Sequence, residues 1–174
     1  SGTVRLRFLD RTLPPSSRSR CLTDHLLGSV FFHRRSPLVV PLAPALNPIS
    51  VDASKGNHNW IYYDKKTFKD FILKLEWRVA PNGNSGIFLG AKKGDAPWAT
   101  GVEVQISNAP RDASHCTGSL YGLAAVDPRP DESADVWHSY EIHCVGTRYT
   151  VIADGVTCVQ STDAHKALLA RPLE

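Results

Sequence analysis

Short runs in which apolar and polar residues alternate dominate the sequence after residue 69. Residues 71–79 place apolar side chains on one face and Lys74, Glu76 and Arg78 on the other. Residues 102–106 and 137–145 alternate in the same way. Because successive side chains of a strand point to opposite faces, this period of two predicts half-buried β-strands.

Turn signals separate these strands at short intervals. Pro81-Asn82-Gly83-Asn84 is typical of a turn, and Gly146-Thr147 and Asp154-Gly155 predict hairpin turns between residues 140–145, 148–153 and 156–160. Further strands are expected at residues 85–89 and 120–126, and one helical turn at residues 165–170. Strands at such spacing without intervening helices predict an all-β fold, an antiparallel β-sandwich.

The first 50 residues differ in composition from the rest. All four Trp and all five Tyr lie after residue 50, whereas six of the 12 Pro lie before it. Because these residues show no sustained period of 2 or 3.6, we expect a weakly structured extension over residues 1–50 and one domain over residues 51–174. A remnant of a targeting region, or translation from a displaced start or frame, is the alternative interpretation.

Charge and hydropathy exclude several classes of function. The 174 residues carry a formal net charge of +3, which is too small to indicate a nucleic-acid partner. The seven Arg of residues 1–50 lack the aromatic interleaving of a nucleic-acid surface. Apolar residues 26–32 and 37–46 are too short or too proline-broken to span a bilayer, and no clear signal peptide precedes them.

The four cysteines show no metal-binding spacing. None belongs to a Cys-x-x-Cys pair, so a structural zinc site is not expected. The predicted turns place Cys144 opposite Tyr149 and Cys158 opposite Val151, on strands separated by a third. This separation is too large for a disulfide, and we predict buried free thiols.

Five motifs in order resemble one known family. They are Asp70-Phe71-Ile72-Leu73-Lys74-Leu75-Glu76-Trp77-Arg78, Gly83-Asn84-Ser85-Gly86-Ile87-Phe88-Leu89, Pro97-Trp98-Ala99-Thr100-Gly101-Val102-Glu103-Val104-Gln105-Ile106, Thr117-Gly118-Ser119-Leu120-Tyr121-Gly122-Leu123 and Trp137-His138-Ser139-Tyr140-Glu141-Ile142-His143-Cys144-Val145-Gly146. In this order and spacing, over roughly residues 57–174, the sequence resembles the 3-keto-disaccharide hydrolase family, also known as DUF1080.

The resemblance implies a concanavalin A-like jelly roll whose concave sheet holds a sugar. It further implies an oligosaccharide or 3-keto-glycoside substrate and a periplasmic or secreted location in a bacterium. Two family features have no counterpart here: an opening Leu-Phe-Asp-Gly strand and a closing Gly-Tyr-Ile-Gly-Leu-Gln strand. We therefore expect a domain truncated at both ends, with an open sheet edge.

The chemistry that the resemblance implies begins at C2 of the sugar. A ketone at C3 acidifies the C2 proton, because the carbanion delocalises into the carbonyl as an enolate. A base can remove this proton and expel the C1 substituent, and water then adds to the enone. Such a site needs a base, a donor for the enolate oxygen and an acid for the leaving group.

Outward strand positions provide the first candidates. Glu103 is our choice for the general base, with an exposed strand carboxylate as the alternative. Arg78 would stabilise the enolate, or else form an ion pair with Glu76 or Glu103. Gln105 and Asn84 suit hydroxyl recognition, although Asn84 could serve only its turn. These predictions assume that the two strands are neighbours in one sheet.

Three further residues complete the predicted site. Trp98, expected in a loop, could stack on a pyranose or close one end of the sandwich. Tyr121 could donate from its phenol or pack at the rim. His143 is the candidate leaving-group acid, with a solvated sheet histidine as the alternative reading.

We expect no cofactor and no metal. Asn57-His58-Asn59 with Asp64 could contact a cation, but such polar loop residues usually satisfy backbone groups. The resemblance implies a hydrolase or lyase that cleaves 3-keto-glycosides, and we place Glu76 among the residues that would bind the sugar. A non-catalytic lectin-like module and an incomplete inactive domain are the alternatives, and the oligomeric state is left open.

Overall fold

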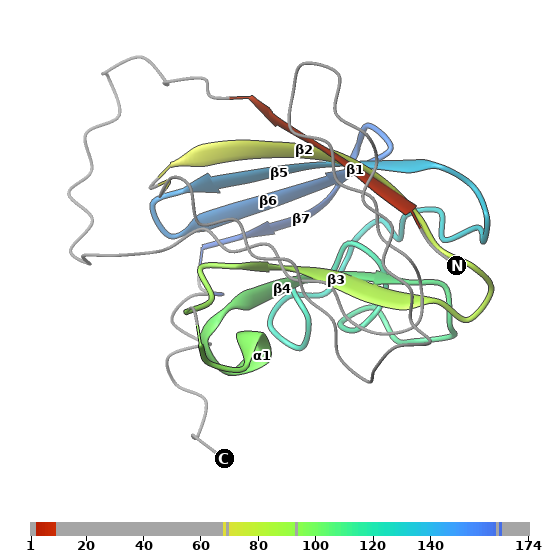
Figure 1. Ribbon diagram of the computed structural model, residues 1–174, viewed down its shortest axis with the longest axis horizontal. Helices are drawn as coiled ribbons and strands as arrows, with labels where there is room; N and C mark the ends of the chain where they lie inside the picture. Colours follow the sequence, from red (N-terminus) through yellow and green to blue (C-terminus); the bar gives the residue numbers. More distant parts are fainter. Residues whose placement is uncertain (1–2, 10–67, 69, 93, 163, 165–174) are drawn as a thin grey trace.

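The computed structural model describes residues 3–9, 68, 70–92, 94–162 and 164. Within these residues, two antiparallel sheets pack face to face (Figure 1). The larger sheet has the order β1-β2-β5-β6-β7, and the smaller sheet pairs β3 with β4. The predicted all-β sandwich is confirmed.

The alternating runs form the strands of both sheets. The larger sheet contains β1 (Thr3–Leu9), β2 (Phe71–Arg78), β5 (His138–Val145), β6 (Arg148–Ala153) and β7 (Val156–Ser161). The smaller sheet contains β3 (Asn84–Leu89) and β4 (Val102–Ser107), joined through the one-turn helix α1 (Pro97–Thr100). Hairpins β5–β6 and β6–β7 turn at Gly146 and Gly155, both with positive φ, as the turn signals predicted.

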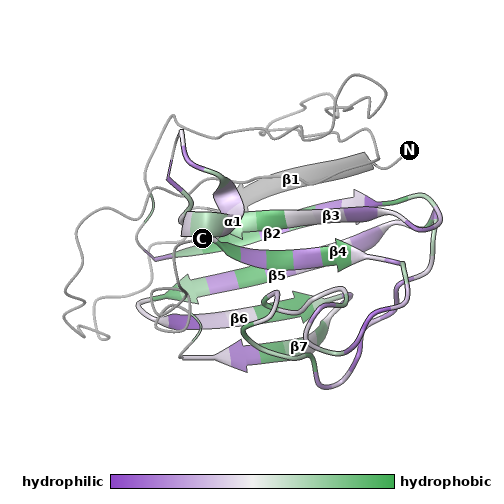
Figure 2. Cartoon of the chain, turned by 90° about the horizontal axis from the view of Figure 1, so that it is seen from below, coloured by the Kyte–Doolittle hydropathy of each residue, from purple (hydrophilic) through white to green (hydrophobic). Residues whose placement is uncertain are grey.

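The core lies between the two sheets. Leu73, Leu75 and Trp77 of β2 face it from the larger sheet, and Val104 and Ile106 of β4 face it from the smaller one. Figure 2 shows how the smaller sheet covers part of the larger sheet's inner face. Burial of these apolar side chains is the main favourable contribution to the sandwich.

One hydrogen bond joins the sheets through the core. The buried Tyr140 of β5 donates from its hydroxyl to the main-chain carbonyl of Gln105 in β4, at 2.6 Å. Burial raises the pKa of Tyr140 well above its ordinary value, so the phenol stays protonated and remains a donor. This bond fixes the position of β4 relative to the larger sheet.

Two local predictions need correction. Residues 120–126 form no continuous strand: Leu120 makes isolated bridges to Val104 and Ala124, because the chain reverses at Gly122, whose φ is positive. Trp98 lies in α1 and not in a loop, since Pro97 opens a helical turn. Thr3–Leu9, which lies within the predicted extension, forms β1 and pairs with β2.

The cysteine prediction is confirmed except in register. Cys116, Cys144 and Cys158 are buried free thiols, and Cys144 lies opposite Tyr149. A bulge between β6 and β7 places Val159 opposite Val151, which leaves Cys158 out of the pairing. Cys21, the helical turn at residues 165–170, the Asn57–Asp64 group and most of the predicted extension lie outside the described residues.

Candidate active site

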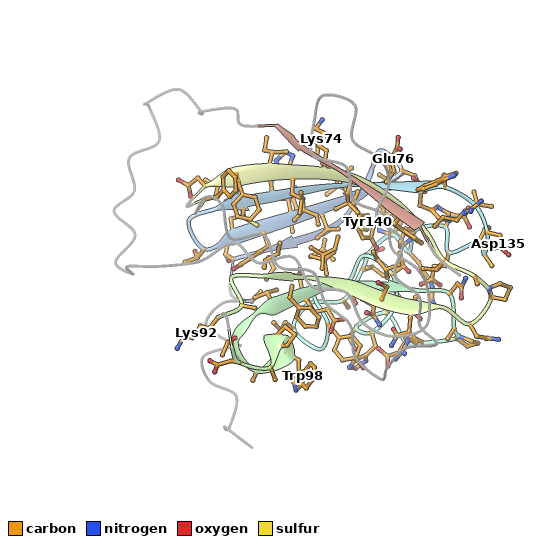
Figure 3. All side chains as sticks on the ribbon, viewed as in Figure 1. Lys74, Glu76, Lys92, Trp98, Asp135 and Tyr140 are labelled. Carbon is orange, nitrogen blue, oxygen red and sulfur yellow. The ribbon has the colours of Figure 1, made fainter. Side chains whose placement is uncertain are left out.

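Each sheet has one face turned away from the shared core. The β3–β4 face consists of Asn84, Gly86, Phe88, Glu103, Gln105 and Ser107, which alternate with core residues; Asn84 and Glu103 are partly exposed and the other four are buried. The β2–β5 face consists of Lys74, Glu76, Arg78, Ser139, Glu141 and His143. Figure 3 shows Lys74 and Glu76 on one side of the sandwich and Trp98 on the other.

Gln105 is the buried polar centre of the β3–β4 face. Its side chain is 1% exposed, and its amide lies 3.0 Å from Asn84 Oδ1. In the flipped orientation of this amide, the Gln105 NH₂ donates to Glu103 Oε1 at 3.2 Å and to the Ser85 carbonyl of β3 at 2.7 Å, and the Gln105 oxygen faces the side-chain amide of Asn84. The amide therefore connects the side chains of Asn84 and Glu103.

Glu103 occupies space that Gly86 leaves open. A Cβ atom added to Gly86 would lie 2.2 Å from Glu103 Oε1 and 2.9 Å from Glu103 Cδ. Gly86 pairs with Gln105 in the next register position, so the carboxylate leans along the strands toward that amide. A side chain larger than that of glycine at this position would displace the carboxylate.

The segment after Cys116 lies along the outer edge of β4. The Gln105 amide donates to the Ser119 carbonyl at 3.0 Å, and the Tyr121 amide donates to the Glu103 carbonyl at 2.9 Å. The bridge between Val104 and Leu120 puts these two residues on the core side. By strand alternation, Tyr121 lies beside Glu103 on the β3–β4 face.

A histidine that the sequence analysis missed adjoins Tyr121. The rings of His115 and Tyr121 meet edge to face, with centroids 4.6 Å apart. His115 Nδ1 lies 2.9 Å from both carboxylate oxygens of Asp112. Ser114 donates to Asp112 from its amide at 2.8 Å and from its hydroxyl at 2.6 Å. These bonds, first those of Ser114 and then that of His115, hold the pKa of Asp112 well below its ordinary value.

A guanidinium reaches the same face from the same loop. Arg111 Nε donates to Ser107 Oγ at 3.1 Å, and Ser107 is the register partner of Asn84. The Arg111 carbonyl accepts a hydrogen bond from Arg129 at 2.9 Å, and Arg129 also pairs with Glu132 at 2.7 Å. This network anchors the loop that carries Arg111, Asp112 and His115.

On the β2–β5 face, Glu141 forms ion pairs with two neighbouring side chains. Lys74 Nζ lies 2.5 Å from Glu141 Oε2, and His143 Nε2 lies 2.7 Å from Glu141 Oε1. Lys74, followed by His143, lowers the pKa of Glu141. A cavity of about 320 Å³ opens on this face, lined in part by Lys74, Glu76, Ser139 and Glu141.

The predicted site residues therefore divide between two faces. The structure brings Glu103, Gln105, Asn84 and Tyr121 together. Glu76, Arg78 and His143 lie on the opposite face of the sandwich, and Arg78 packs over the Trp137 ring at 5.4 Å. The assumption that β2 and β4 are neighbours is wrong, because they belong to different sheets. One site cannot use both sets.

Trp98 lies apart from both strand sets. It projects from α1 with 45% of its surface exposed, on the side of the molecule away from the larger sheet (Figure 3). An exposed indole on this side is available to a ligand approaching from the side of the β3–β4 face. Its predicted stacking on a pyranose stays a prediction.

Metal-binding and membrane-spanning features were sought within the described residues. There, no three His, Cys, Asp or Glu side chains are grouped closely enough to hold a metal ion. No helix in the same part of the chain is long and apolar enough to cross a membrane. The periplasmic or secreted location stays a prediction.

Comparisons with known proteins agree with the fold and the motifs. The model of the 3-keto-alpha-glucoside-1,2-lyase-like domain matches residues 45–171, which is more than half of the chain. Two solved structures from Parabacteroides distasonis ATCC 8503, each named a "putative glycosyl hydrolase", are 18% identical, with TM-scores of 0.54 and 0.47. The alignments cover 61% and 55% of this chain and 56% and 58% of those chains. No match was found among curated proteins.

Proposed function

Because the chain belongs to the 3-keto-alpha-glucoside-1,2-lyase-like family, we propose that it cleaves 3-keto-glycosides with Glu103 as general base. The family assignment supports a carbohydrate-active function, and the mechanism and the residues are our proposal. The observation that carries it is the placement of the Glu103 carboxylate, held over Gly86 by Gln105 and beside Tyr121.

The first step removes a proton from C2. Glu103 takes the C2 proton, the electron pair enters the C2–C3 bond as the enolate forms, and the C1–O bond then breaks. Water adds to C1 of the resulting enone, and C2 regains a proton from Glu103. The sum is hydrolysis with no change of oxidation state, and it needs no oxocarbenium-stabilising pair of carboxylates.

Neighbouring polar groups fit the remaining needs of this reaction. Arg111 brings a guanidinium to the β3–β4 face, where it would stabilise the enolate oxygen in place of Arg78. Asn84 and the Tyr121 phenol would bind sugar hydroxyls, and Trp98 would stack on a pyranose ring. The roles of Arg111, Asn84 and Tyr121 follow from their position on this face, and that of Trp98 from its exposed ring on the same side of the molecule.

The opposite face is a poorer choice for the base. Glu141 is paired with Lys74 and His143, and these partners lower its pKa. A carboxylate with a lowered pKa is a weaker base, whereas general-base catalysis favours a pKa close to the working pH. The ion pairs also occupy the groups that would contact a substrate.

Hydrolysis in D₂O tests the proposed reaction. The substrate is 4-nitrophenyl 3-keto-glucoside, and the readouts are nitrophenolate release and deuterium at C2 of the sugar product after a short incubation. The proposal predicts release together with one deuterium at C2, because the proton that Glu103 takes exchanges with solvent deuterons before the carboxyl protonates C2. Release without deuterium would show an ordinary glycosidase mechanism. Sugar binding without release, measured by calorimetry, would instead favour the lectin-like module.

A further inference from the structure

We infer that His115, oriented by Asp112, is the acid that protonates the leaving group at C1 and the base that activates water in the second step. This inference rests on the proposed function, because it assigns the acid for that same reaction. It replaces His143, whose ring lies on the opposite face of the sandwich and contacts Glu141.

The first argument is position. Tyr121 lies beside Glu103 on the β3–β4 face, and the His115 ring meets the Tyr121 ring edge-on at 4.6 Å. The loop is fixed there by the Gly122 amide, which donates to the Ser114 carbonyl at 2.9 Å. An elimination needs its base at C2 and its acid at the neighbouring C1 oxygen, so the two groups must line one face.

The second argument is the protonation pattern of the ring. Asp112 is held as a carboxylate, so it accepts hydrogen bonds, and Nδ1 of His115 must donate to it. Ser114 uses its hydroxyl hydrogen on Asp112, and its oxygen, 3.0 Å from Nδ1, can only accept from the ring. Nδ1 therefore carries a proton, and Nε2 is the nitrogen that can exchange one.

The third argument is access. The His115 side chain is 37% exposed, and among the described residues none forms a hydrogen bond with Nε2. The ring is thus oriented, able to carry a proton and open on one side.

The proposed steps conserve protons and electrons. As Glu103 takes the C2 proton and the C1–O bond breaks, the leaving oxygen takes the proton from His115 Nε2. Neutral His115 then accepts a proton from water as its oxygen bonds to C1. Glu103 returns its proton to C2, and both groups regain their starting states.

Two substrates with different leaving groups distinguish a general-acid role of His115 from a purely structural one. The His115→Asn variant is compared with the wild type on 4-nitrophenyl and methyl 3-keto-glucosides of one anomeric configuration. Nitrophenolate leaves without a proton, whereas methanol needs one. We expect kcat to fall about 100-fold or more on the methyl glycoside, as for loss of a general acid. On the nitrophenyl glycoside, the rate of nitrophenolate release in the first turnover, before water adds to C1, should fall less than about fivefold.

Equal losses on both substrates, or no loss on either, would overturn the inference. If the wild type cleaves neither glycoside, the proposed function fails and this inference fails with it. Circular dichroism and thermal melting show whether the variant is folded. If His115→Asn is unfolded, the test uses Asp112→Asn instead, which keeps the His115 ring but removes its charged partner.

Asp112→Asn should lower the methyl-glycoside rate about tenfold and leave the nitrophenyl rate nearly unchanged. Asp131→Asn is the matched control, since Asp131 makes the same pair of bonds to Ser133 without a histidine. The control should leave both rates unchanged. A similar loss in both aspartate variants, or no loss from Asp112→Asn, would contradict the positioning role of Asp112.

Discussion

The two outward faces carry similar residue types but differ in how the carboxylate is held. On the β3–β4 face, Glu103 lies over a glycine and accepts from a buried amide. On the β2–β5 face, Glu141 lies between Lys74 and His143, both partly exposed. The first arrangement positions a carboxylate, whereas the second neutralises one.

The difference shows what turns a polar sheet face into a candidate site. The β3–β4 face receives a neighbouring loop whose side chains approach the strand residues from the β4 edge. The described part of the β2–β5 face instead pairs Glu141 with Lys74 across the strands and with His143 along β5, and such partly exposed pairs contribute little. Substitutions at equivalent positions on the two faces should therefore have unequal effects.

The largest effect is expected for Gly86→Ala. The added Cβ would lie 2.2 Å from Glu103 Oε1, so the carboxylate must move. Because misplacement by about 1 Å can cost about 100-fold in rate, we expect kcat to fall about 100-fold. Steady-state kinetics on the nitrophenyl substrate measures the effect. In a Glu103→Gln chain, adding Gly86→Ala should lower kcat little further, because the carboxylate that it would displace is already gone. If the two losses in kcat instead multiply fully, Gly86 does not act by positioning Glu103.

A smaller but still large effect concerns stability. Gln105→Leu removes a buried amide and leaves the groups that it bridges without their partner, so we expect a loss of about 1–3 kcal/mol in the free energy of unfolding. Lys74→Met breaks an ion pair with 41% and 29% exposed side chains, and should cost less than about 1 kcal/mol. Urea unfolding measures both, and the reverse order would refute the comparison.

Acid should lower the stability of the fold by protonating Glu141 on the β2–β5 face. Lys74 and His143 lower its pKa below the ordinary 4.5. A carboxyl with a lowered pKa stabilises the fold above its unfolded value, and this contribution is lost as the pH falls through the folded value. Between pH 6 and pH 3, the melting temperature of Glu141→Gln should therefore fall less than that of the wild type. Parallel curves for the two proteins would argue against this coupling.

The smallest effect concerns the core between the faces. Burial raises the pKa of Cys158 to about 11 and raises that of Cys144 further. The native thiols should therefore react slowly with Ellman's reagent at pH 8. In a Cys21→Ala chain, which removes the thiol outside the described residues, guanidinium should expose three reactive groups. Rapid reaction of the folded chain would show that the core is open.

Local structure was largely predictable from the sequence, because strands and turns depend on neighbouring residues. The alternation predicted the outward positions of Glu76 and Glu103, and Asp154-Gly155 predicted its turn. Which strands share a sheet was not predictable in the same way. The pairing of β2 with β5 joins residues far apart in the chain, and alternation contains no information about the partner.

The residues of the candidate site were predictable from the sequence only where they lie in or next to strands. Glu103 and Gln105 were found because they occupy outward positions of an alternating strand, and Asn84 because it follows the Pro81–Gly83 turn signal. Asp112 and His115 lie in a loop without a period, where the only local signal was an Asp followed two residues later by a Ser, typical of a side-chain turn. The bulge at Cys158 was also not predictable, because one extra residue in a strand does not change the composition from which the strand was predicted.

The most direct test of this account compares one substitution on each face. Glu103→Gln and Glu141→Gln remove the same charge at outward strand positions of the two sheets, and turnover of 4-nitrophenyl 3-keto-glucoside is measured for both. We expect Glu103→Gln to lose at least about 1,000-fold in kcat, within the range for loss of a general base, and Glu141→Gln to stay within about twofold of the wild type. Loss of turnover in Glu141→Gln with retention in Glu103→Gln would place the chemistry on the opposite face and contradict the account.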